Sequence, residues 1–71
     1  MANQHVVPFE GDWAVRPEHG EITSIHRTQQ EAIDVARFQA QIEESELFIH
    51  RRNGQFRERN TYGRDPYPPP G

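Results

Sequence analysis

The sequence predicts an α+β domain in which one helix packs on one face of a mainly antiparallel sheet, in the order β-β-β-α-β-β. Three features indicate this fold. Asn53-Gly54 separates two strand-like runs, two more strand-like runs flank Glu10-Gly11-Asp12, and a helical pattern follows Thr28. The 71 residues allow a single small domain. We expect it to span residues 1–62, with a proline-rich tail over 63–71.

The strand-like runs near the start of the chain, 4–9 and 13–16, form the first predicted hairpin. We expect a three-residue loop over 10–12, because that register puts all the large apolar side chains on one face, as a half-buried sheet requires. These side chains are Val7, Phe9, Trp13 and Val15. Pro8 lacks an N–H, which predicts that the first strand lies at an edge of the sheet.

A weaker third strand is predicted over 21–26, and the helix begins soon after it. Thr28 and Glu31 have the spacing of a capping box, in which the threonine hydroxyl accepts from the backbone N–H three residues later. Beyond them, apolar residues cover a broad arc of the helix. They are Ala32, Ile33, Val35, Ala36, Phe38, Ala40 and Ile42.

Asn53-Gly54 predicts a second hairpin with a two-residue type I′ turn, because both turn positions need φ > 0. The resulting register pairs His50 with Arg57 and Phe48 with Arg59. One face should pack on the core and collects Leu47, Ile49, Arg51, Phe56 and Glu58. The opposite face is cationic and collects Phe48, His50, Arg52, Gln55, Arg57 and Arg59. The predicted core includes Trp13, Val15, Ile49 and Phe56.

The cationic face of this hairpin is the candidate binding surface. An exposed sheet can stack bases on an aromatic ring and hold phosphates with arginine, and a two-stranded ribbon can enter a major groove. The residues expected to contact nucleic acid are Phe48, His50, Arg52, Arg57 and Arg59. The same pattern also fits the solvated face of a sheet that is covered on one side, or a face used for self-association.

Other classes of function find less support. The chain lacks cysteine, and its four histidines lack the paired short spacing of a metal site. No hydroxyl is spaced to pair with a histidine base, so we expect neither catalytic residues nor a cofactor. No apolar run approaches the roughly 20 residues of a membrane span, and the first residues do not form a signal peptide. We therefore expect a cytoplasmic protein without a membrane partner.

These observations predict a non-catalytic binding or assembly module that contacts nucleic acid through the cationic hairpin face. The alternative is a protein-interaction or homo-oligomerisation module that uses the same face or an edge strand. The formal net charge of −3 argues against non-specific coating of nucleic acid.

Short motifs in a fixed order resemble a known family. They are Trp13-Ala-Val15, Thr28-x-x-Glu-Ala-Ile33, Glu46-Leu-x-Ile-His50 before Asn53-Gly54, and Tyr62-Gly-x-Asp-Pro66 with Pro68-Pro69. Together they resemble the small prokaryotic family called domain of unknown function 2188, from His5 to Gly71. The resemblance supports the predicted fold, and it implies no agreed activity and no catalytic residues.

Overall fold

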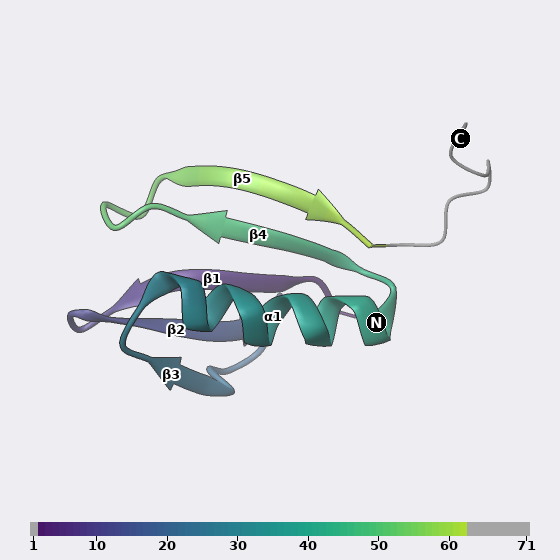
Figure 1. Ribbon diagram of the computed structural model, residues 1–71, viewed down its shortest axis with the longest axis horizontal. Helices are drawn as coiled ribbons and strands as arrows, with labels where there is room; N and C mark the ends of the chain where they lie inside the picture. The colour runs from purple at the N-terminus through teal and green to yellow at the C-terminus, as the bar shows by residue number, and fades with distance from the viewer. Residues whose placement is uncertain (1, 63–71) are drawn as a thin grey trace.

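Within residues 2–62, five strands form one mixed sheet, and a single helix lies across one of its faces (Figure 1). The computed structural model describes residues 2–62, so the proline-rich tail predicted over 63–71 lies outside the described residues. The elements are β1 (Gln4–Phe9), β2 (Asp12–Pro17), β3 (Ser24–His26), α1 (Gln29–Glu43), β4 (Glu46–His50) and β5 (Phe56–Thr61). This order and the single covering helix confirm the predicted fold class. Within residues 2–62, no helix combines the length and apolarity needed to cross a membrane.

The strand order is β3-β2-β1-β4-β5, with β1 in the centre of the sheet. The helix carries the chain from β3 across the sheet, so β4 pairs with β1 in parallel while the other three pairs are antiparallel. The prediction that Pro8 keeps the first strand at an edge is therefore wrong. The parallel ladder with β4 involves Gln4 to Val6, and Pro8 lies beyond its end, where no N–H is required of it.

The hairpin of β1 and β2 has a two-residue loop, which corrects the three-residue prediction. Glu10 and Gly11 have φ values of 49° and 85°, as a type I′ turn requires. Val6 pairs with Val15, and Val7 therefore points to the opposite face. The prediction was wrong because both faces of these strands contain apolar side chains, so alternation alone did not select the register.

The hairpin of β4 and β5 has the longer loop, which corrects the predicted type I′ turn at Asn53-Gly54. Only Gly54 of the loop takes a positive φ, 90°. Its N–H donates to the Arg51 carbonyl over 2.8 Å, and the Arg51 N–H donates to the Gln55 carbonyl. This is a type I turn over residues 51–54 whose last residue, Gly54, lies in the left-handed region, the usual three-residue hairpin loop.

A β-bulge in β5 then compensates for the extra loop residue. His50 pairs with Phe56 and Ile49 pairs with Glu58, so Arg57 is an inserted residue without a partner in the ladder. The pairs beyond the bulge keep the predicted register, Ile49–Glu58 and Phe48–Arg59. Near the loop, however, the bulge reverses two predicted directions. Phe56 points away from the helix, and Arg57 points toward it.

The hydrophobic core lies between α1 and the sheet. Its buried members are Val6, Trp13, Val15, Ala32, Ile33, Ala36, Ala40, Leu47 and Ile49. The predicted core positions of Trp13, Val15 and Ile49 are confirmed, whereas Phe56 is 52% exposed because the bulge turns it away from the helix. The predicted cap is also confirmed, since the Thr28 hydroxyl accepts from the Glu31 N–H over 3.1 Å.

The apolar arc of α1 is wider than the surface that the sheet covers. The alanines of the helix allow close approach to the sheet and are fully buried, whereas three larger side chains remain outside the core. They are Val35, Phe38 and Ile42, with exposures of 41%, 65% and 61%. The spacing of these three residues places them along one stripe of the helix.

Candidate nucleic-acid interface

An open hollow of about 540 Å³ lies between the β4–β5 loop and the start of α1. It is lined by Trp13, Arg27, Thr28, Gln29, Arg51, Arg52 and Arg57, and we call it the arginine hollow. All eight basic residues of the chain are arginines, and four of them line this one surface. Among the residues that the structure describes, no acidic residue lines the hollow. The hollow is therefore a local concentration of positive charge in a chain whose net charge is −3.

Three segments bring these arginines together. Arg27 directly precedes the helix cap, Arg51 and Arg52 belong to the hairpin loop, and the bulge directs Arg57 toward the helix. Arg57 Nη1 donates to Gln29 Oε1 over 2.7 Å. Gln29 Nε2 in turn donates to the carbonyl of a β4 residue over 2.9 Å. Gln29 thereby links the hairpin to the first turn of α1.

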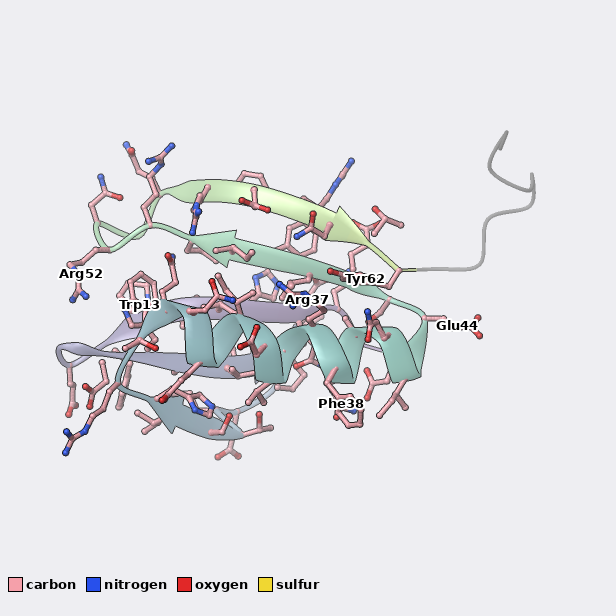
Figure 2. The ribbon with its side chains drawn as sticks, viewed as in Figure 1. Trp13, Arg37, Phe38, Glu44, Arg52 and Tyr62 are labelled. Atoms are coloured by element: carbon pink, nitrogen blue, oxygen red, sulfur yellow. The ribbon has the colours of Figure 1, made fainter. Side chains whose placement is uncertain are left out.

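Trp13 forms a wall of the hollow. The Arg52 guanidinium carbon lies 5.2 Å from the centroid of the Trp13 ring, a cation–π contact. Figure 2 shows the two side chains close to each other at the end of the molecule where the hairpin loop lies. Because Trp13 is only 4% exposed, its ring belongs to the core and is not available to stack on a ligand.

The remaining arginines differ in their internal partners. Arg57 Nε lies 3.7 Å from Glu58 Oε1, so part of its charge is compensated. The Arg27 and Arg51 side chains make no hydrogen bond or ion pair with any residue that the structure describes. The positive end of the α1 dipole, at Thr28, adds to their field. Arg27 and Arg51 are thus the groups most available to an external anion.

The structure divides the five residues that the sequence assigned to nucleic acid. Arg52 and Arg57 line the arginine hollow. Phe48, His50 and Arg59 lie on the other face of the sheet, where Arg59 Nε is 3.6 Å from Glu46 Oε1. The bulge in β5 accounts for the position of Arg57, whereas Arg52 lies in the loop beyond the end of β4.

Two arginines of the hollow are not among the binding residues predicted from the sequence. The predicted register places Arg51 on the core face of the hairpin, and no sequence pattern considered above places Arg27 on a surface. A signal for Arg27 was present, because a basic residue immediately before a capping box must lie at the positive end of the helix.

The sheet face away from α1 holds a cluster of stacked rings. His5 stacks on Phe48 with centroids 4.9 Å apart, and the Phe48 and Phe56 centroids are 5.8 Å apart. The His50 ring meets Phe56 edge-on at 5.9 Å. These four residues, His5, Phe48, His50 and Phe56, form what we call the ring cluster, which spans β1, β4 and β5. Phe56 is its most exposed member.

His5 connects the ring cluster to Glu18, the residue that follows β2. Its Nδ1 lies 3.1 Å from His50 Nε2, and its Nε2 lies 3.3 Å from Glu18 Oε1. Burial lowers the pKa of His5, against the opposing effect of its hydrogen bond to Glu18, and the charge of Arg16 lowers that pKa further. The hydrogen bonds from His5 and Asn3 lower the pKa of Glu18. Within residues 2–62, no group of three or more metal-binding side chains is assembled.

The lowered pKa of His5 predicts a loss of stability in mild acid. Because the unfolded chain accepts a proton near pH 6.5 and the folded chain resists it, the contribution is intact above pH 6.5. It is lost as the pH falls from about 6.5 toward the folded pKa of His5. We expect the midpoint of urea unfolding to fall over this range, and His5→Gln should reduce that dependence.

His19→Gln is the matched control, because the His19 side chain is 90% exposed and also lies near Glu18. It should leave the pH dependence of the parent unchanged. Equal pH profiles for the parent and His5→Gln would contradict the prediction.

Comparison with known families identifies a match. Residues 4–62 match the family described as "Uncharacterized protein conserved in bacteria (DUF2188)". This match covers most of the chain and agrees with the resemblance of the sequence motifs. No curated protein and no solved structure matches the chain.

Proposed function

Because the chain belongs to the family of uncharacterized bacterial proteins DUF2188, whose description names no activity, we propose a function from the arginine hollow itself. The protein is a non-catalytic module that binds nucleic acid through its phosphates. The observation that supports this proposal is the convergence of four arginines from three segments at the positive end of α1. A nucleic-acid partner also fits the cytoplasmic location that we propose.

The chemistry of the lining favours phosphate over other anions. The planar guanidinium group offers paired N–H donors that match two phosphate oxygens, and arginine remains charged at any physiological pH. Arg27 and Arg51 can make such contacts without breaking an internal ion pair with a described residue. The hollow is open to solvent, so a polymeric ligand can lie across it without having to enter by one of its ends.

The same lining supports binding without catalysis. Its one hydroxyl group is that of Thr28, which already accepts the Glu31 N–H as the helix cap. Among the described lining residues there is no histidine or carboxylate that could act as a general base for this hydroxyl. The groups present can hold an anion in place, and they offer no pair for proton transfer.

We expect the double variant Arg27→Gln with Arg51→Gln to weaken binding of a labelled single-stranded oligonucleotide at least about 100-fold, since each of the two lost charge-assisted contacts is worth about 1.5–3 kcal/mol. The dependence of log K on log salt should flatten by about 1.4, because each phosphate contact on a single strand contributes about 0.7. Fluorescence anisotropy at several low salt concentrations measures both quantities.

Arg16→Gln with Arg37→Gln is the matched control. It removes the same two charges, taking the net charge from −3 to −5 in both variants, and neither residue lines the hollow. The control should bind with nearly the parent's salt slope. The proposal fails if, at low salt, the parent binds neither this strand nor the same strand paired with its complement, or if both double variants lose the same affinity.

Self-association is the second candidate function, and the exposed stripe of α1 favours it. Val35, Phe38 and Ile42 present apolar surface on a helix face that the sheet does not cover. Exposed apolar patches of this kind are typical of protein contacts. Sedimentation distinguishes the candidates, because the chain alone has a mass of 8.3 kDa and a dimer would have twice that mass.

A further inference from the structure

Phe56 is a large aromatic residue that lies outside the hydrophobic core and is partly exposed to solvent. It begins β5, which lies at the edge of the sheet, and its side chain is 52% exposed. In a regular hairpin with the predicted turn it would have faced the core. The bulge instead turns its ring to the face away from α1, where Phe48 and His50 support it.

The bulge also places a cation directly beside this ring but on the other face. Arg57 follows Phe56 in sequence and reaches Gln29 in the arginine hollow. Consecutive Cα atoms are about 3.8 Å apart, so an exposed ring and a phosphate-binding group flank the same point of the sheet edge. Among the described residues, no strand lies beyond β5 to separate the two faces.

We propose that Phe56 stacks on a base and that the ligand of the arginine hollow is single-stranded nucleic acid. The sugar–phosphate chain passes around the β5 edge, with a phosphate in the hollow and the neighbouring base on the Phe56 ring. This inference rests on the proposed function and names the class of nucleic acid that the site takes.

The requirement for a single strand follows from stacking. In a duplex each base is already stacked and paired, whereas a single strand can turn a base outward onto an aromatic side chain. The hollow supplies the complementary charge through Arg27, Arg51 and Arg57. The ring cluster holds Phe56 in place, since its ring contacts both Phe48 and His50.

Three substitutions of Phe56 test the inference by fluorescence anisotropy at low salt. The probes are a labelled oligonucleotide of mixed sequence, and the same strand paired with its complement. Phe56→Ala and Phe56→Leu should weaken binding of the single strand about 5- to 150-fold, because alanine loses the ring and leucine keeps only apolar bulk. Phe56→Trp should restore binding to near the parent's level. Binding of the duplex should change little in all three.

Phe38→Ala is the matched control, because Phe38 is 65% exposed and lies on α1, remote from the hollow in Figure 2. It should bind both probes as the parent does. If binding of the single strand depends on the arginines but is unchanged by Phe56→Ala and Phe56→Leu, the inference is overturned and the proposed function stands. If the parent binds neither the single strand nor the duplex, the inference and the proposed function are both overturned. If the parent is a dimer and Phe56→Ala is a monomer, the Phe56 ring serves self-association and the inference is also overturned.

Discussion

Replacement of Trp13 by alanine is expected to unfold most of the protein at room temperature. Trp13 is 4% exposed and packs in the cluster that joins β1, β2 and β4 to the helix. Truncation of a buried aromatic side chain costs about 3–5 kcal/mol. A domain of this length has a total stability of roughly 4–10 kcal/mol, so the loss removes much or all of it.

The variant also loses the ring on which Arg52 rests, and the wall of the arginine hollow with it. Because Trp13 is the only tryptophan of the chain, its fluorescence cannot report on the variant, and far-UV circular dichroism during heating is the appropriate measurement. Trp13→Phe is the control. It keeps an aromatic ring in the core and should retain a cooperative melt at a lower temperature. A Trp13→Ala melt close to that of the parent would show that the ring is not part of the core.

Local interactions explain what the sequence predicted well. The cap at Thr28 depends on residues three positions apart, and the helix that follows was predicted from the spacing of its apolar residues. The fold class follows from the number and order of such elements. Strand order is different, because the parallel pairing of β1 with β4 depends on a crossover that no local pattern encodes.

The two turns show why register was harder to predict. Gly54 takes a positive φ, as predicted, but a type I turn with a glycine bulge needs that conformation as much as a type I′ turn does. Glu10 adopts a positive φ without being glycine or asparagine, which sequence preference disfavours. In both hairpins the choice depends on which side chains the helix covers, and that is a tertiary property.

The same limit applies to the candidate site. Arg52 and Arg57 were predicted as binding residues, and both line the hollow, but the predicted face also contained Arg59, which lies on the other side of the sheet. One inserted residue in β5 accounts for the difference between Arg57 and Arg59, since it changes the direction of the side chains between the bulge and the loop. Arg27 could join the site only once the helix start and the hairpin loop were placed side by side.

Replacement of Leu47 by alanine is expected to lower the free energy of unfolding by about 2–5 kcal/mol. Leu47 is fully buried in β4, where it pairs with Gln4 of β1 on one side and with Asn60 of β5 on the other. Its side chain points to the helix, and neighbouring strands on both sides limit how far the structure can relax into the cavity. Urea denaturation measures the loss, with the slope of the transition expected to stay the same.

Ile42→Ala is the control for Leu47→Ala. It removes a branched apolar side chain of the same size as that of Leu47, but from the exposed stripe of α1, where Ile42 is 61% exposed. In the monomer it should change the free energy of unfolding by no more than about 0.5 kcal/mol. Comparing the two variants tests whether the core lies only between α1 and the sheet. Both residues are large and apolar, but the sheet and helix cover Leu47 and leave Ile42 exposed. If Ile42→Ala proved as costly as Leu47→Ala at a protein concentration where the chain is monomeric, the stripe would have to be packed within the domain. A cost that appeared only at higher protein concentration would instead place the stripe in an interface between chains, because dissociation then contributes to the measured stability.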